Sequence, residues 1–262
     1  MPKWQERDMG IEMERALDFM TEVAASLMSY GSPTTRTEIW VTKIGQKLGF
    51  QVDIAIIYTV IYITIRDKDG NFKSITKRLF SLPSDFEKFM RVDTLVKKFV
   101  DGNIQLAEAH IELKKIINDQ STYSIFLRLI AAALTCGGFE YVLVGGTMSA
   151  IASMVLGAVV YAATNYVKLL NNRFFQQFTS GIMISIGAWL LVHLFKGSTL
   201  SGVVSGSIML FVPGLLITNG FSEISQASVI SGTIKESEAM ALLIALVFGI
   251  FAGTVFVGGM NF

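Results

Sequence analysis

The chain has 262 residues, of which 52% are hydrophobic and only 16% are charged, whereas a typical soluble domain carries about 25% charged residues. Its formal net charge of +1 provides no strongly basic surface, so we expect no nucleic-acid partner. The single cysteine, Cys136, excludes an internal disulfide. The composition therefore argues against an ordinary soluble protein and against a disulfide-stabilised one.

The charged residues are unevenly distributed along the chain. Residues 1–123 carry 17 of the 22 Lys and Arg and 17 of the 21 Asp and Glu. We therefore predict a soluble head over residues 1–123 and a membrane domain over residues 124–262. The first ten residues contain no apolar stretch typical of a cleaved signal, so we expect a cytoplasmic head on a multi-pass protein of the cell (inner or plasma) membrane.

The head begins with two predicted helices and a small sheet. Apolar residues recur at helical spacing from Ile11 to Met28, and a second helix is expected from Thr34 to Leu48 after the Gly31–Pro33 break. From residue 52 the period changes to two, and Asp69-Gly70 predicts a turn. This alternation predicts antiparallel strands at 52–57, 60–66 and 72–78.

Two further helices complete the predicted head. Ser84 and Glu87 have the spacing of a capping box, which predicts a helix continuing to Phe99. A fourth helix is expected around residues 107–116. The head is therefore predicted to have an α+β fold.

Long apolar runs begin after Tyr123, and each has the length needed to cross a hydrocarbon core about 30 Å thick. They predict an α-helical integral membrane bundle of about five transmembrane helices in a lipid bilayer. The expected spans are 125–144, 147–167, 178–195, 199–219 and 239–257. The few basic residues between them favour a cytoplasmic head by the positive-inside rule.

Glu140 is a carboxylate deep in the first predicted span. An ionised group at this depth costs about 2.5–3.5 kcal/mol, so it should face the bundle or water rather than lipid. One interpretation is a protonatable or solute-contacting group on a transport path. The other is a structural carboxylate, or one that reaches the outer interface.

Pro213-Gly214 interrupts the fourth predicted span. Proline removes a backbone donor, and transporters use such broken helices to present backbone groups to a solute. A simple packing kink is the alternative. A polar segment follows the interruption and favours the functional interpretation; its candidate residues for the solute path are Thr218, Asn219, Ser222 and Glu223.

The head offers few candidates for chemistry. Arg36 and Glu38 open the second helix, where they could bind a ligand, dock the head on the membrane domain, or form a local ion pair. Phosphate-binding loops, nucleophile elbows and clustered metal-ligating residues are not evident in the sequence. We therefore expect no cofactor, no metal and no enzymatic activity.

Two segments give the chain a resemblance to the threonine/serine exporter family, in particular to its shorter split-subunit members. The first is YGSPTTRTEIWVTKIGQKLGF (Tyr30–Phe50), where Thr35, Arg36 and Glu38 match the head motif of the family. The second, residues 208–239, is similar to the family's Val-Pro-Gly, Thr-Asn, acidic and Ser-Gly series. Its matching residues are Pro213, Gly214, Thr218, Asn219, Glu223, Ser231 and Gly232.

The second segment also departs from the family pattern. Glu223 stands where the family usually has aspartate, and Ser222 ends a tripeptide in which the family usually has arginine. The resemblance implies export of small polar solutes, either hydroxy amino acids such as threonine and serine or dicarboxylates such as succinate. It also implies a second, smaller membrane subunit, and a homo-oligomer is a further possibility.

The sequence leaves two other classes of function open. One is a membrane-anchored, hydrolase-like enzyme with its active site in the head, and the other is a regulatory membrane subunit that transports nothing. The leading hypothesis is a secondary exporter in which Pro213-Gly214 opens the helix, Asn219 and Glu223 contact solute, and Glu140 carries the coupling proton.

Overall fold

The computed structural model describes residues 3–80, 84–119, 123–166 and 172–259, which form two compact units. The head unit is Met1–Gln120 with Leu215–Glu236, and the bundle unit is Ser121–Gly214 with Ser237–Phe262. The units therefore do not follow a single division at residue 123. The segment 215–236, expected in the membrane domain, packs within the head unit because its polar residues bond to head residues.

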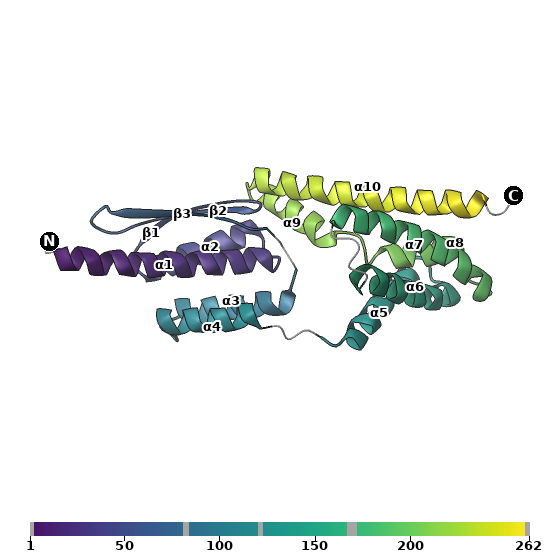
Figure 1. Ribbon diagram of the computed structural model, residues 1–262, viewed down its shortest axis with the longest axis horizontal. Helices are drawn as coiled ribbons and strands as arrows, with labels where there is room; N and C mark the ends of the chain where they lie inside the picture. Colours follow the sequence, from purple (N-terminus) through teal and green to yellow (C-terminus); the bar gives the residue numbers. More distant parts are fainter. Residues whose placement is uncertain (1–2, 81–83, 120–122, 167–171, 260–262) are drawn as a thin grey trace. The chain divides into compact units, whose positions relative to one another are not determined.

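The head unit has three layers, which Figure 1 shows as the sheet, then α1 and α2, then α3 and α4. The predicted order of elements is confirmed, with small shifts at the ends. The elements of residues 3–119 are α1 (Lys3–Ser29), α2 (Thr34–Lys47), β1 (Gln51–Ile57), β2 (Val60–Arg66), β3 (Phe72–Arg78), α3 (Phe86–Val100) and α4 (Leu106–Asn118).

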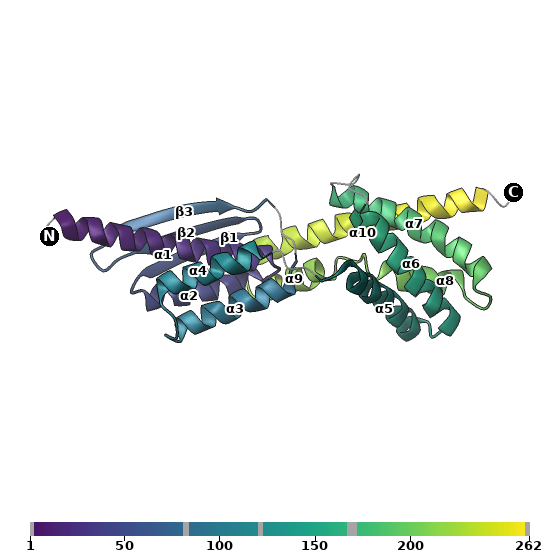
Figure 2. The same ribbon diagram turned by 60° about the horizontal axis from the view of Figure 1, so that its bottom comes forward.

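The three strands form an antiparallel sheet in the order β1-β2-β3, which is visible in Figure 2. Ile57 pairs with Val60 across the first turn, and Arg66 pairs with Phe72 across the second. Along β2, Ile61, Ile63 and Ile65 are buried against the helices while the alternate residues face outward. This alternation is the period of two that the sequence predicts.

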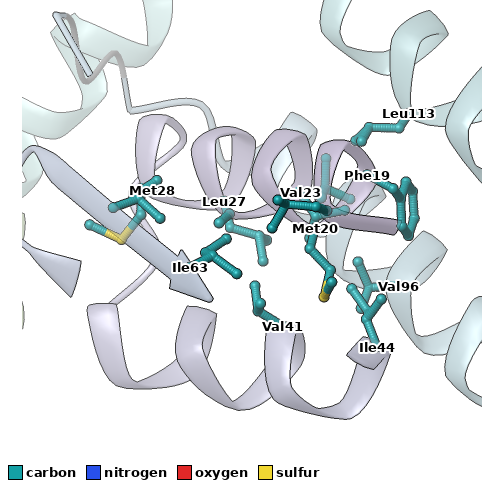
Figure 3. Close-up of a cluster of buried hydrophobic side chains, with 14 of the residues drawn as sticks. Phe19, Met20, Val23, Leu27, Met28, Val41, Ile44, Ile63, Val96 and Leu113 are labelled. Atoms are coloured by element: carbon teal, nitrogen blue, oxygen red, sulfur yellow. The ribbon is translucent and has the colours of Figure 1, made fainter. Parts of the chain in front are cut away.

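The core of the head unit lies around α1. Phe19, Met20, Val23 and Leu27 are fully buried on one face of this helix, and Figure 3 shows them against residues of α2, β2, α3 and α4. Each fully buried side chain of this size contributes about 1.5–3 kcal/mol of hydrophobic stabilisation. The core therefore fixes α2, whose first residues belong to the candidate site.

The N-terminus of α3 differs from the predicted capping box. Asp85, not Ser84, is the N-cap, and its carboxylate accepts a hydrogen bond from the backbone N–H of Lys88 at 3.0 Å. An Asp cap satisfies the same free N–H groups as a Ser cap, so the helix begins one residue later than expected.

The described residues of the bundle unit form helices joined by turns and irregular segments, without a strand. Its complete helices are α5 (Ile125–Leu143), α6 (Thr147–Tyr166), α7 (Arg173–Leu194) and α8 (Leu200–Ile208). Two more helices complete the described chain: α9 (Gly214–Ser225), which lies in the head unit from Leu215, and α10 (Val229–Gly259), which begins in the head unit and ends in the bundle unit. As predicted, α5 and α6 are joined by a very short turn.

Four described helices are long and apolar enough to cross a membrane: Ile125–Leu143, Thr147–Asn165, Arg173–Leu194 and Val229–Gly259. The count of five spans is not confirmed, because residues 199–219 do not form one helix. There α8 ends after 9 residues and α9 begins at Gly214. Residue 167, the end of the second predicted span, lies outside the described residues.

Candidate functional site

A helical hairpin made of α9 and the first turns of α10 carries most of the second sequence signature. Two glycines bring its helices together: a Cβ atom added at Gly232 would lie only 2.6 Å from the carbonyl oxygen of Gly220. Ala227, between the helices, has a φ of 65°, a left-handed conformation that is unfavourable for a residue with a side chain. The hairpin is therefore built for close contact between α9 and α10.

Glu223, on α9, is fully buried in the head unit and has two partners. Its Oε1 accepts a hydrogen bond from the backbone N–H of Thr34 at 2.7 Å and forms an ion pair with Lys235 of α10, which is itself only 4% exposed. The buried carboxylate thus links α9 to both α2 and α10.

Glu223 caps the N-terminus of α2, which has no side-chain cap from its own segment. Pro33 is the N-cap of this helix, and no side-chain hydrogen bond caps the helix from its own segment. The first N–H groups of a helix lack internal partners, and together they carry a partial positive charge. Glu223 satisfies one of them with a negative charge from 189 residues away. We call Thr34, Glu223 and Lys235, together with Glu38 one helical turn after Thr34, the capping cluster.

Two more hydrogen bonds hold the hairpin to the rest of the head unit, and one of them reaches the first sequence signature. The side-chain amide of Asn219 donates to the carbonyl oxygen of Gly31 at 3.2 Å, and Ser231 Oγ accepts from the backbone N–H of Tyr58 at 2.8 Å. Tyr58, in the β1–β2 turn, has a φ of 49°. The first signature and residues 215–236 of the second, far apart in sequence, are therefore one structural feature of the head unit.

Glu38 is the second carboxylate of the capping cluster. It is half-buried on α2, and its Oε1 accepts a hydrogen bond from the backbone N–H of Ile56 at 3.0 Å. Burial raises the pKa of Glu38 above its ordinary value of 4.5, and the negative charge of Glu223 raises it further, while the Ile56 N–H acts in the opposite direction. The capping cluster thus holds two carboxylates for one ammonium group.

Other predicted site residues of the head unit have local partners. Arg36 forms an exposed ion pair with Asp93 of α3 at 2.8 Å, and Thr35 is half-buried beside it. The hydroxyl of Thr218 donates to the carbonyl oxygen of Leu215 at 3.3 Å, and Ser222 Oγ accepts from the amide of Gln226 at 2.8 Å. These contacts lie within one helix or between α2 and α3, outside the capping cluster.

Glu140 occupies a different kind of site in the bundle unit. It is fully buried in α5, and neither of its carboxylate oxygens has a hydrogen-bond partner among the described residues. Three glycines, which we call the glycine cradle, surround it: Gly146, Gly202 and Gly206. A Cβ atom added at Gly202 would approach Glu140 Oε1 to 2.7 Å, and one at Gly146 would approach it to 3.1 Å.

Hydroxyl groups lie beside the glycine cradle. The Oγ of Ser149, on α6, accepts a hydrogen bond from the backbone N–H of Thr199 at 2.9 Å, and Ser153 Oγ donates to the carbonyl oxygen of Val203 at 3.2 Å. Glu140 is therefore enclosed by the backbone and by small polar groups of α6 and α8.

A polar side chain of α7 bonds to the irregular backbone before Pro213. Between α8 and α9 the helical hydrogen bonds stop, and the freed carbonyl oxygen of Phe211 accepts from the side-chain amide of Gln177 at 2.7 Å. The Oε1 of Gln177 is buried and has no hydrogen-bond partner among the described residues. Gln177, on α7, thus supports the break in the way required of irregular backbone at membrane depth.

Sequence reasoning missed several of these residues. Lys235 is not among the candidate residues taken from the sequence, yet it and Glu223 are two of the nine charged residues after residue 123, and they lie twelve residues apart. Two opposite charges in so apolar a segment could have indicated this ion pair from the sequence. Thr34 and Gln177 gave no such signal, because they contribute through backbone and amide groups. In the described ranges no cluster of His, Cys, Asp and Glu could hold a metal ion.

Comparison with known proteins agrees with the resemblance expected from the sequence. Among curated proteins the chain is similar to Pheromone-regulated membrane protein 10 of Yarrowia lipolytica (24% identical over 251 residues), of Pichia sorbitophila (22% over 248) and of Saccharomyces cerevisiae (21% over 250). Each alignment covers 92% of this chain but only 20%, 25% and 32%, respectively, of the relative. No solved structure matches the chain.

The family model named ThrE, described as "Putative threonine/serine exporter", matches residues 18–257. The match runs from α1 to the last turns of α10 and includes both signatures, the capping cluster and the glycine cradle. This membrane protein therefore belongs to the ThrE family.

Proposed function

We propose that the chain is a subunit of a secondary exporter that moves small polar metabolites out across the cell membrane. The solutes we propose are hydroxy amino acids of the threonine and serine type, or dicarboxylates such as succinate. The ThrE family match and the four apolar helices support a transporter-type role. In this proposal the head is cytoplasmic and the chain acts as a transporter subunit rather than as an enzyme.

Glu140 is the observation that carries the proposal. A buried carboxylate without hydrogen-bond partners is costly, because burial removes its hydration and nothing replaces it. Such residues in membrane segments commonly belong to ion or solute pathways. We therefore assign the coupling proton to Glu140, and we assign the solute path to the break at Pro213-Gly214 that Gln177 supports.

The proposal includes a second, smaller membrane subunit. At 1.5 Å per residue, α8 spans about half of a hydrocarbon core some 30 Å thick. A short helix followed by irregular backbone needs neighbouring protein to keep its polar groups away from lipid. A companion subunit supplies that enclosure. The exposed apolar residues of α5, such as Phe126, Leu134 and Val142, leave surface for lipid or for this companion.

The test is efflux from vesicles that contain the chain and its companion subunit. Vesicles are loaded with labelled threonine, serine or succinate, and release is measured with and without an imposed proton gradient. We expect Glu140→Gln to reduce gradient-driven release to that of empty vesicles, because the amide keeps the shape but cannot carry a proton. Glu108→Gln, at an exposed position on α4, is the control for charge loss.

A pair of glycine variants tests the enclosure of Glu140. Gly202→Ala places a methyl group within 2.7 Å of Glu140 Oε1, whereas Gly138→Ala, on α5, meets nothing within 4 Å. We expect the first to abolish transport and the second to preserve it. Wild-type release from the Glu140→Gln protein would remove the coupling role. Release no faster than from empty vesicles with the wild-type pair would instead favour a regulatory subunit.

A further inference from the structure

We propose that Glu38 is a proton-binding site of the head, and that its protonation controls how firmly the head holds the α9–α10 hairpin. This inference concerns the capping cluster and needs no transported solute, so it stands apart from the proposed function. It begins with where the charges of the cluster lie. All of them are in the head unit.

Glu38 lies between two points at which the hairpin is bonded to the head. It is one helical turn after Thr34, whose N–H bonds to Glu223, and its partner Ile56 is two residues before Tyr58, whose N–H bonds to Ser231. From α9, Glu223 is already bonded to Thr34 and Lys235. From α10, Lys235 is the one ammonium group of the capping cluster, and Glu236 beside it lies against Gly220. The β1–β2 side contributes only backbone, through Ile56. On α2 itself Arg36 is committed to Asp93.

The charge balance of the capping cluster is therefore negative when both carboxylates are ionised. Lys235 compensates Glu223, and the partner of Glu38 among the described residues is the backbone N–H of Ile56. Glu223 cannot move away to reduce the repulsion, because it caps α2 and is fully buried. One proton on Glu38 neutralises the cluster without disturbing any of these contacts.

Two buried oxygens of the capping cluster indicate that it has little capacity to stabilise a further negative charge. Glu223 Oε2 and Thr34 Oγ1 are both buried and have no hydrogen-bond partner among the described residues. Partly satisfied polar groups are already costly at low dielectric, and an additional negative charge there adds to this cost. Adding that charge at Glu38 should weaken the attachment of the hairpin to Thr34 and Gly31.

The sign of the pH dependence follows from linkage. Burial raises the pKa of Glu38 above 4.5, and the charge of Glu223, which belongs to the hairpin, raises it further. Docking supplies this Glu223 contribution, so the docked state binds the proton more tightly than a state in which the hairpin is released. The attachment is therefore strongest below pH 4.5 and weakens as pH rises through the raised pKa. Each unit by which docking raises that pKa changes the docking equilibrium about tenfold.

The experiment is amide hydrogen exchange of the full chain in lipid nanodiscs, without solute, from a pH below 4.5, the ordinary pKa of Glu38, up to neutral pH. The readout is the protection of α9 after correction for the intrinsic pH dependence of exchange. In the wild type we expect protection of α9 to fall as pH rises. Glu38→Gln retains an oxygen that accepts from Ile56 but is permanently neutral, so its protection should stay high at every pH.

Two further variants keep the result interpretable. Glu38→Asp retains a titratable carboxyl and should keep a pH response, which separates loss of titration from a folding defect. Glu236→Gln removes a neighbouring charge on α10 and should leave the wild-type response. An unchanged pH response in Glu38→Gln, or its loss in Glu236→Gln alone, would overturn the proposal.

Discussion

The two compact units each bury one glutamate completely, and the two glutamates have opposite environments. In the head unit, Glu223 has a backbone N–H and a lysine as partners. In the bundle unit, Glu140 has no partner for either carboxylate oxygen among the described residues. Both side chains are 0% exposed, so burial alone does not distinguish them.

The partners indicate what each carboxylate does. A buried charge with an ammonium group and a helix N-terminus is held in one position, and removing either partner leaves the other uncompensated. A buried carboxylate with no partner remains free to take up a proton or to contact a solute. We therefore interpret Glu223 as the attachment of the hairpin to the head, whereas the environment of Glu140 is compatible with its proposed role in transport.

Among the variants that test this comparison, Lys235→Met is expected to cause the largest loss of stability. This change leaves Glu223 buried without its cation, and breaking a buried pair by removing one partner costs about 3–5 kcal/mol. The free energy of unfolding of the head should fall by that amount in urea denaturation of the full chain, followed by hydrogen exchange of α2 and α9.

A double variant makes that prediction specific. Adding Glu223→Gln to Lys235→Met removes the uncompensated charge, so a large part of the lost stability should return. If the double variant is no more stable than Lys235→Met alone, the loss came from packing and the ion pair is not what attaches the hairpin.

A smaller effect is expected from Thr34→Pro, which removes the N–H that donates to Glu223. Proline is well tolerated at the first position of a helix, and Pro33 already has the extended φ of −59° and ψ of 148° that a following proline requires. The change thus removes a hydrogen bond to a charged group, worth about 1.5–3 kcal/mol. Protection of α9 in hydrogen exchange should fall accordingly.

Thr34→Ala is the matched control, because it removes the same side chain but keeps the backbone N–H that donates to Glu223. The Thr34 hydroxyl has no hydrogen-bond partner among the described residues, so this change should leave the protection of α9 close to that of the wild type. Equal loss in both variants would mean that α2 is disturbed generally.

Most of the fold was predictable from local patterns. Alternation along Val60–Arg66 predicts β2, and the helical spacing from Ile11 to Met28 predicts the buried face of α1, because these patterns reflect a nearby core. The assignment of 215–236 was not predictable in this way. The sequence of an apolar helix looks the same whether the helix faces lipid or another part of the protein. Here only the hydrogen-bond partners of Asn219 and Glu223 distinguish these two environments.

The candidate site was predictable in its residues but not in its geometry. The two signatures identified Glu38, Asn219 and Glu223, and family resemblance suggested a solute path. What brings them together is a bond from the backbone N–H of Thr34, and a backbone donor leaves no trace in sequence. The isolation of Glu140 was equally hidden, since the three glycines around it come from two separate segments, the α5–α6 turn and α8.

The smallest effect is expected at the interruption between α8 and α9, where Gln177→Leu would leave the carbonyl oxygen of Phe211 without its donor. An unsatisfied buried carbonyl costs about 1–3 kcal/mol, and the cost is local because the helices on either side keep their own hydrogen bonds. Gln176→Leu is the control, since its amide lies 3.4 Å from the carbonyl oxygen of Thr164, at the limit of a hydrogen bond. We expect Gln177→Leu to lower the thermal unfolding midpoint more than Gln176→Leu does and to slow efflux, while the exchange protection of α9 at the capping cluster stays unchanged. If α9 lost protection as well, the interruption and the attachment of the hairpin would be one cooperative element, and the separate roles of Glu140 and Glu223 would have to be abandoned.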